Sequence, residues 1–402
     1  MIDAKVKPMK YTRSLSERTK EYDFRSLDLS SFAGNYNWDE LLDPQTILDL
    51  SFNSQTKFPT SVAQKFAERL ALAKNRGLGI NALHEKGYTG QGATVAIIDQ
   101  PLLTSHIEIH DNLIHYEELG KTTDNAEHFE TASQHGISVS SILCGKNIGV
   151  APDAKLTYFA VPPNADTDAY IDAISRVIEY NKTLPDDEKI HTVSISYGFP
   201  IDKDEKQEVR LHEVIKQANE TDMFVITTSL DKTHNLPFLG ADRDISADLD
   251  NPNNYKEPVF IQKKNLPSSN NTNSTHTFNS DVSVPPTLLV PQDRVTVASP
   301  TGDSNYTYYT DGGMSWATPY LAGVYAIAKN TFPNLTPEKF FSAAYTTCTS
   351  REIAGRDCCI INAKNLMKSL EFSNSSAKLN SIQNKQDAIQ SINYIKDNKN
   401  DR

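Results

Sequence analysis

Short apolar runs alternate with amphipathic helical patterns along most of this 402-residue chain, from about residue 80 to residue 370. Runs rich in β-branched residues, each about the length of a strand, occupy residues 94–98, 155–161, 192–197, 223–228 and 294–298. Apolar residues recur at helical spacing over residues 170–180, 207–218 and 316–330. Nearly continuous apolar strands separated by amphipathic helices indicate a parallel sheet covered on both faces. The alternation therefore predicts an α/β fold of three layers, in which a mostly parallel central sheet is flanked by helices.

Polar segments flank and interrupt this region. The first 58 or so residues are polar without a long period, and a helix is expected to follow them because Val62, Phe66 and Leu70 repeat every four residues. Two later stretches are dominated by turn-forming residues or by Asn, Ser, Lys and Gln. We therefore expect an N-terminal extension, a main domain, an irregular insertion within that domain and a flexible polar tail, over residues 1–79, 80–370, 231–285 and 371–402 respectively.

Composition narrows the classes of function. The formal net charge of −11 argues against a protein that binds nucleic-acid phosphates or anionic membranes. No apolar run approaches the roughly 18 residues of a membrane span, and the first 30 residues lack the apolar stretch of a secretory signal. We therefore expect a cytoplasmic protein. The four cysteines fit neither a disulfide framework nor a zinc-binding spacing, so we expect reduced, packed thiols.

Three segments place a reactive side chain at the end of a strand or the start of a helix. Asp99 directly follows the apolar run at 94–98, at the carboxyl end of a predicted strand, where open α/β sheets bind ligands. His135 stands at the start of a run of small and apolar residues that predicts a closely packed helix. Taken singly, each of these two residues would be interpreted as a helix cap or turn residue.

The third segment surrounds Ser315. Pro319 follows four residues later, and because only the first turn of a helix tolerates proline, a helix is expected to begin close to Ser315. A serine in that position lies at the positive end of the helix dipole, beside free backbone N–H groups. That environment suits an alkoxide or a tetrahedral oxyanion.

In this order the three segments resemble the motifs of the subtilisin-like serine peptidases, the subtilase family, in which Asp, His and Ser follow one another along the chain. The matching blocks are Gly87-Tyr88-Thr89-Gly90-Gln91-Gly92, Ile97-Ile98-Asp99 with His106, His135-Gly136 with Gly149-Val150-Ala151-Pro152, Ser196-Tyr197-Gly198, and Gly313-Met314-Ser315-Trp316-Ala317-Thr318-Pro319. The resemblance covers roughly residues 80–350. Trp316 stands where the family has Met, a change that we expect to alter the pocket but not the chemistry.

The resemblance implies a serine endopeptidase with a subtilisin-like fold. It implies that Ser315 forms an acyl-enzyme, that His135 is the general base and that Asp99 orients His135. It also implies that the main chain of Ser196 and Gly198 binds an extended protein or peptide substrate. Family members often carry an N-terminal propeptide, so the extension is interpreted either as a propeptide or as a permanent structural layer.

The chain departs from the family at the oxyanion donor. The family supplies a side-chain Asn at the end of a strand, and the simplest register places Asp231 there. An ionised carboxylate cannot donate a hydrogen bond. Asn235, Thr228 and Ser229 are the other candidate donors. The departure keeps a second interpretation open, in which the chain is a weak or inactive homologue that acts as a binding or regulatory scaffold; an unrelated ligand-binding module is a third.

No cofactor is expected for this chemistry. The acidic stretch 242–251 lacks the central Gly and terminal Glu of an EF-hand, so we interpret it as a solvated loop rather than a calcium site. The resemblance leaves structural calcium elsewhere open. His106 and His110 are four residues apart without the HExxH pattern, so we expect structural roles for both and no metal. The oligomeric state is left open.

Overall fold

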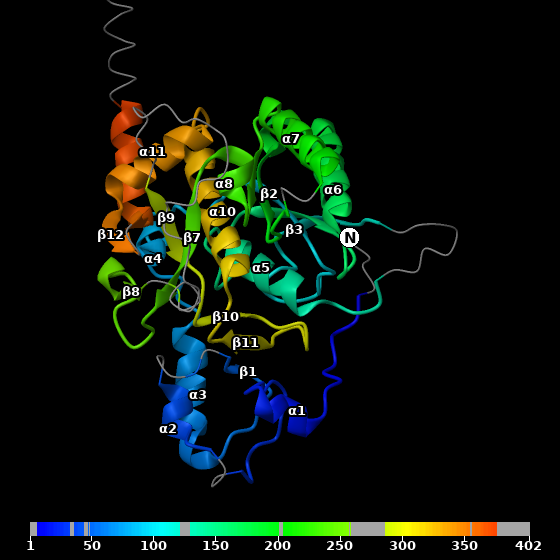
Figure 1. Ribbon diagram of the computed structural model, residues 1–402, viewed down its shortest axis with the longest axis vertical. Helices are drawn as coiled ribbons and strands as arrows, with labels where there is room; N and C mark the ends of the chain where they lie inside the picture. Colours follow the sequence, from blue (N-terminus) through cyan, green and yellow to red (C-terminus); the bar gives the residue numbers. More distant parts are fainter. Residues whose placement is uncertain are drawn as a thin grey trace, which may run out of the picture.

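A parallel five-stranded sheet, of order β3-β4-β2-β5-β6, forms the centre of the structure (Figure 1). The structure is a computed structural model that describes residues 6–32, 36–43, 47, 49–120, 129–200, 204–256, 258, 286–353 and 356–375. The strands of this sheet are β2 (Thr94–Asp99), β3 (Leu113–Glu118), β4 (Lys155–Ala160), β5 (Ile190–Ile195) and β6 (Phe224–Thr227). Strand β2 is buried throughout and pairs with β4 on one side and β5 on the other. Asp99 therefore emerges from the middle of the sheet at its carboxyl edge.

Helices cover both faces of this sheet, because alternate side chains of each strand point to opposite faces. Val95 and Ile97 of β2 belong to the core shared with α5 (Gln134–Cys144) and α10 (Met314–Thr331). Ala96 and Ile98 belong to a second core, shared with α6 (Thr167–Thr183) and α7 (Glu205–Glu220). The three-layer α/β prediction is confirmed. The α5 and α10 helices carry His135 and Ser315, so the two residues lie on one side of the sheet.

A second five-stranded sheet, of order β12-β13-β9-β7-β8, lies beside the first. Its strands are β7 (Phe238–Arg243), β8 (Tyr255–Lys256), β9 (Thr287–Pro291), β12 (Thr349–Ile353) and β13 (Arg356–Ile360). Other helices of the main domain are α4 (Ile80–His84), α8 (Leu230–His234) and α11 (Pro337–Thr347), with two short 3-10 turns, η1 (Asp186–Glu188) and η2 (Pro252–Asn254).

The expected irregular insertion is therefore partly regular. Its described part, residues 231–256 and 258, contains most of α8 and all of β7 and β8. Strand β7 has only six residues and pairs in parallel with β9, beyond residue 285. The strand is fixed by a partner distant in sequence, so a local pattern did not reveal it. The rest of the expected insertion lies outside the described residues.

The N-terminal extension shares a third sheet with the main domain. Strand β1 (Ser51–Asn53) pairs antiparallel with β11 (Tyr306–Tyr309), which also pairs with β10 (Val295–Ala298). The strand expected at 294–298 thus lies in this sheet and not in the parallel one. The helices of the extension, blue in Figure 1, are α1 (Leu15–Lys20), α2 (Trp38–Leu42) and α3 (Thr60–Leu72).

An aromatic core holds this layer together. The rings of Phe58 and Phe66 stack with centroids 3.7 Å apart, and Phe52 packs against both Phe66 and Tyr308 of the main domain. Each aromatic pair of this kind contributes roughly 0.5–1.5 kcal/mol beyond the burial of its surface. The layer is therefore bound to the main domain both through its core and through a sheet.

The first residues of the expected flexible tail are helical. Residues 363–375 form a helix, so 371–375 are helical, and residues 376–402 lie outside the described part.

Cys144, Cys358 and Cys359 are buried free thiols, and Cys348 is half-buried. No helix in the described ranges has the length and apolar character needed to span a bilayer.

Candidate active site

Asp99 and His135 are joined by a hydrogen bond at the carboxyl edge of the parallel sheet. The distance between Asp99 Oδ1 and His135 Nδ1 is 2.7 Å. The same carboxylate oxygen accepts the N–H of Gln100 at 2.7 Å, which fixes its orientation. Ser133 caps α5 by accepting the backbone N–H of His135 at 3.1 Å. The imidazole is thus held through Nδ1, and Nε2 is left for another partner.

The pKa of His135 is raised above its ordinary value of 6.5. Burial lowers it, but the negative charge of Asp99 and the hydrogen bond that the imidazole donates to that carboxylate together outweigh burial. Both favourable contributions act on the imidazolium. The pair is therefore arranged to stabilise His135 after it has accepted a proton.

Ser315 is the second residue of α10, as the position of Pro319 predicted. Gly313 precedes the helix with φ of 61°, a left-handed conformation that glycine adopts without steric cost. The N–H groups of the first helical turn have no carbonyl within the helix to bond. The backbone N–H of Ser315 is one of these groups.

The backbone of Ser315 is anchored to the sheet. Pro319 lacks an N–H, so it cannot bond the carbonyl of Ser315 four residues earlier, as an ordinary helical residue would. Ser196 Oγ donates a hydrogen bond to that carbonyl at 2.8 Å. Ser196 directly follows β5, and its hydroxyl thus satisfies the carbonyl that Pro319 leaves free.

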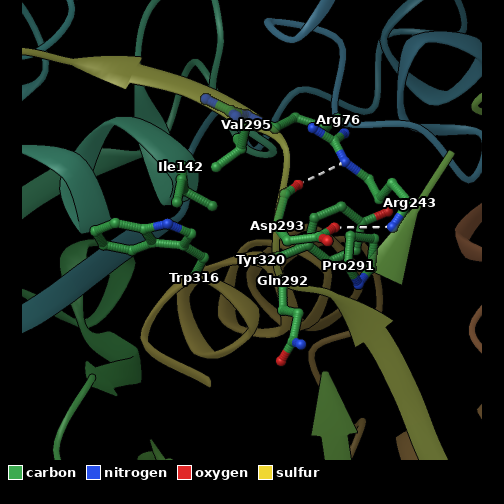
Figure 2. A pocket seen from close by; sticks show the side chains of 9 residues that line it. All are labelled: Arg76, Ile142, Arg243, Pro291, Gln292, Asp293, Val295, Trp316 and Tyr320. Atoms are coloured by element: carbon green, nitrogen blue, oxygen red, sulfur yellow. Dashed lines mark hydrogen bonds between the residues drawn. The ribbon is translucent and has the colours of Figure 1, made fainter. Parts of the chain in front are cut away.

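His135 and Ser315 line one open hollow of about 700 Å³. Trp316 also lines it, with its indole centroid 5.6 Å from that of the His135 ring. Figure 2 shows another side of Trp316, where a cavity of about 10 Å³ is lined by buried charges including Arg76, Arg243 and Asp293. The volume of this cavity is about that of one water-sized sphere. Of these two spaces, the hollow that His135 and Ser315 line is the one with room for a peptide.

The buried charges of Figure 2 support the backbone. Arg76 donates to the carbonyls of Ile148, Thr296 and Ser141. Burial and the nearby charge of Arg243 lower the pKa of Arg76 to about 9. Since the guanidinium is occupied by main-chain carbonyls, we interpret this cluster as structural.

The candidate oxyanion donors lie on two different surfaces. Asp231 is exposed on α8, and Asn235 is exposed at its C-cap with φ of 55°. None of the four candidates is among the described residues that line the hollow shared by His135 and Ser315. The other two, Thr228 and Ser229, follow β6 at the carboxyl edge of the sheet.

Thr228 and Ser229 face the segment that the sequence marks for substrate binding. Strands β5 and β6 pair with Ile195 opposite Thr227, so Thr228 follows beside Ser196. A Cβ atom built on Gly198 would lie 3.2 Å from Thr228 Oγ1 and 4.0 Å from Ser229 Oγ. Gly198 itself is exposed. This part of the edge therefore carries two hydroxyl groups, next to Ser196 and Gly198, that can donate hydrogen bonds.

The residues considered for metal binding have other partners. His106 is buried, with Nε2 2.9 Å from the carbonyl of Asn305, whereas His110 is exposed beside Asp111. In the acidic stretch, Asp250 accepts the N–H of Gly79 at 2.7 Å. Within the part of the chain that the structure describes, no cluster of three or more His, Cys, Asp or Glu side chains is arranged to hold a metal ion.

Comparison with known proteins gives consistent matches. The family model described as the subtilase family of peptidases matches residues 90–380. An intracellular serine protease of Paenibacillus polymyxa is 25% identical over 246 residues, which are 60% of this chain and 67% of the relative. Two solved structures are similar. The PatG macrocyclase domain has 13% sequence identity and a TM-score of 0.47, and the match covers 73% of this chain and 95% of that domain. The prenylagaramide maturation protease PagA has 17% identity and a TM-score of 0.46, and the match covers 73% of this chain and 98% of PagA.

Proposed function

This chain belongs to the subtilase family, and from that premise we propose that it is a serine endopeptidase in which Ser315 is the nucleophile, His135 the general base and Asp99 the orienting carboxylate. The observation that carries the proposal is the 2.7 Å bond between Asp99 and His135, at the edge of the hollow that Ser315 also lines. The serine protease relative supports the same class of activity.

In the proposed acylation step, His135 Nε2 accepts the proton of Ser315 Oγ while that oxygen attacks the carbonyl carbon of a peptide bond. The tetrahedral intermediate collapses when His135 returns the proton to the leaving amine. An ester on Ser315 remains. Water then attacks the ester with His135 again as base, which releases the carboxylic acid product and restores the serine hydroxyl.

The negative oxygen of the tetrahedral intermediate requires donors. One is the backbone N–H of Ser315 in the first turn of α10. We assign the second to the hydroxyl of Thr228, because a hydroxyl donates where the carboxylate of Asp231 does not. Its place beside Ser196, which bonds the carbonyl of Ser315, supports this assignment.

The proposed substrate is an extended protein or peptide segment. Gly198 is exposed and Ser196 half-exposed just beyond β5, where an added strand can bond their main chain. No cofactor enters any step of this mechanism. The order of Asp, His and Ser along the chain is that of subtilisin.

Peptides blocked at both termini test the endopeptidase proposal, because exopeptidases cannot act on them. Purified wild-type protein is expected to release internal fragments with new carboxyl and amino termini, identified by mass spectrometry. Ser315→Ala, prepared in parallel, is expected to release none. Equal cleavage by both proteins would assign the activity to a contaminant.

A binding scaffold with little turnover is the second candidate, and the exposed position of Asp231 and Asn235 favours it. The two functions differ in whether bound peptide is cleaved. A scaffold binds the blocked peptides without cleaving them, and its affinity for them is expected to be the same in wild type and in Ser315→Ala.

A further inference from the structure

The first described residues of the N-terminal extension reach the candidate active site. Lys7 forms a parallel bridge with the segment that leads into α5: its N–H donates to the carbonyl of Glu130 at 2.8 Å, and its carbonyl accepts from Ala132 at 2.9 Å. The N–H of Met9 donates to the carbonyl of Pro300 at 2.8 Å, just beyond β10. Backbone hydrogen bonds therefore attach this segment both to the residues just before α5 and to the end of β10, a strand of the sheet that the extension shares with the main domain.

Side chains of the same segment lie beside the catalytic residues. Met9 lines the hollow that contains His135 and Ser315. Tyr11 OH donates to Gln134 Oε1 at 3.2 Å, and Gln134 immediately precedes His135. Because about 700 Å³ of the hollow stays open beside Met9, the segment forms a wall of the hollow and does not fill it.

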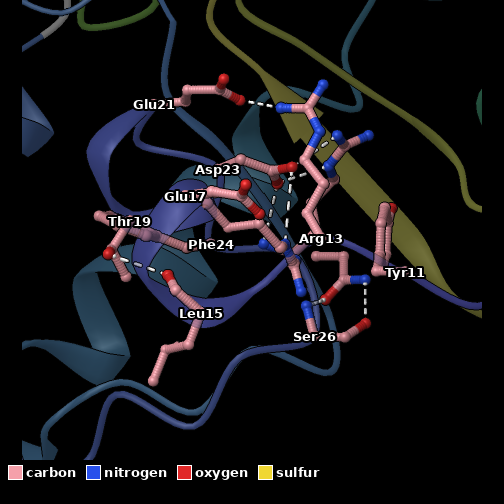
Figure 3. Close-up of polar contacts among 12 residues, drawn as sticks. Tyr11, Arg13, Leu15, Glu17, Thr19, Glu21, Asp23, Phe24 and Ser26 are labelled. Carbon is pink, nitrogen blue, oxygen red and sulfur yellow. Dashed lines mark hydrogen bonds and ion pairs between the residues drawn. The ribbon is translucent and has the colours of Figure 1, made fainter.

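A charged cluster connects the segment to Tyr309, another residue that lines the hollow. Figure 3 shows its polar contacts, with Asp23 near the middle and Tyr11 at the right. Arg25 binds Asp23 through two hydrogen bonds of 2.7 and 2.8 Å, and its third nitrogen donates to Tyr309 OH at 2.7 Å. The guanidinium also lies 4.7 Å from the ring centroid of Tyr11. A bidentate pair of this kind fixes direction as well as charge.

Tyr309 connects Arg25 to α10, the helix that contains Ser315. Its ring centroid lies 5.7 Å from that of Trp316, which directly follows Ser315. Trp316 in turn lies 5.6 Å from the ring of His135. Arg25, Tyr309 and Trp316 thus form a continuous series of contacts from the extension to the catalytic residues.

We propose that residues 6–25 are a permanent brace of the active site, retained in the active enzyme, and that Arg25 and Tyr309 are positioning residues that hold Trp316 beside His135 and Ser315. The proposal rests on the proposed function of that site. It favours the structural-layer interpretation of the extension over the propeptide. The sheet formed by β1 and β11 supports it, because removal of the extension would take away β1 with Phe52 and uncover Tyr308 of the main domain.

The first test asks whether active enzyme retains the brace. Wild-type protein is treated with a fluorophosphonate, purified under denaturing conditions and weighed intact by mass spectrometry. We expect the species with an adduct on Ser315 to contain residues 6–25 in the same chain. Labelled protein that consistently lacks these residues would overturn the brace and favour a removed propeptide.

The second test measures positioning. Arg25→Ala is expected to lower kcat about tenfold per labelled site with little change in KM, because small displacements of catalytic groups reduce rate more than binding. Normalising to labelled Ser315 removes any effect of misfolded protein. Arg25→Lys keeps the charge and is expected to recover part of the loss, and Tyr309→Phe keeps the ring but loses the hydroxyl and is expected to lie between wild type and Arg25→Ala.

Arg13→Ala is the matched control. Arg13 pairs with Glu21 in the same cluster, but both side chains are more than half exposed, and such pairs contribute little. Its kcat is expected to equal that of wild type. Equal kcat for Arg25→Ala and Arg13→Ala would overturn the positioning role. Absence of both adduct and hydrolysis in wild type would instead overturn the proposed function, and the brace with it.

Discussion

The two sides of the candidate site are built differently. On the orienting side, Asp99 is buried and bonded to both Gln100 and His135, and the raised pKa of His135 follows from that pairing. On the oxyanion side, the chain leaves β6 and enters α8, which carries Asp231 and Asn235 to the surface. The orientation of His135 is therefore fixed by its bond to a buried carboxylate, whereas in the proposed mechanism the oxyanion is stabilised by a backbone N–H and a hydroxyl. Variants on the two sides are expected to differ in size of effect and in pH dependence.

Asp99→Asn is expected to have the largest effect of the side-chain changes around the nucleophile. A neutral amide favours the wrong tautomer of His135, so kcat is expected to fall about 10³–10⁴-fold. In wild type the acid limb of kcat/KM is expected above pH 6.5, because the pKa of His135 is raised and the base must be neutral. In the variant burial alone acts on the imidazole, so that limb moves to lower pH. A pH–rate profile of wild type and of the variant measures the position of this limb in each. A limb that stays at the same pH in Asp99→Asn would mean that Asp99 does not raise the pKa of His135.

Thr228→Val is the corresponding change on the oxyanion side. It removes the hydroxyl and keeps the shape, and kcat is expected to fall about 10²–10³-fold, the range found for loss of one such donor in subtilisin, a member of the same family. Thr228→Ser retains the hydroxyl and is the matched control, with activity close to wild type. The acid limb is expected to stay unchanged in both. Full activity of Thr228→Val would mean that another group is the donor, and Ser229→Ala would then be the next variant to measure.

Ser196→Ala tests the anchor of the nucleophile. The carbonyl of Ser315 loses the hydroxyl that bonds it at 2.8 Å, and Pro319 cannot replace that bond. A lost hydrogen bond of this kind costs roughly 1 kcal/mol, and a small displacement of Ser315 is expected to lower kcat about tenfold. Steady-state kinetics with titrated active sites measures the change. A rise in KM at constant kcat would mean that Ser196 acts on substrate alone.

Asp231→Asn is expected to have the smallest effect, with kcat within about twofold of wild type, since substitutions of exposed residues away from such features change little. The change restores the residue type that the family carries near this point. A tenfold rise in kcat would show that α8 contributes its first turn to the oxyanion site, and the contrast between the two sides would then be wrong.

The same contrast explains what sequence reasoning predicted. The ends of β2, α5 and α10 are marked by local signals: an apolar run that stops at Asp99, a run of small residues after His135, and Pro319 near the start of its helix. Helix α8 has five residues and no side-chain cap, which is too short for a periodic signal, so the direction of Asp231 was not predictable. Which residues face Ser315 there depends on tertiary packing.

The extension was predicted only in part: its helix α3 was expected and a structural layer was one of two interpretations, but its core was not predicted. Its aromatic residues have no regular spacing, and they form a core only because β1 pairs with β11 across about 250 residues of sequence. Such pairing leaves no local pattern. Composition alone therefore described a polar segment where the structure has a layer in contact with the active site.

Covalent labelling of wild-type protein with a fluorophosphonate at neutral pH, followed by peptide mass spectrometry, tests whether Ser315 is the nucleophile activated by His135 and Asp99. We predict one adduct, on Ser315, that forms much more slowly in Asp99→Asn and is absent in Ser315→Ala. No adduct on the wild type, or an adduct on the neighbouring Ser133 or Ser196 with Ser315 unmodified, would contradict it.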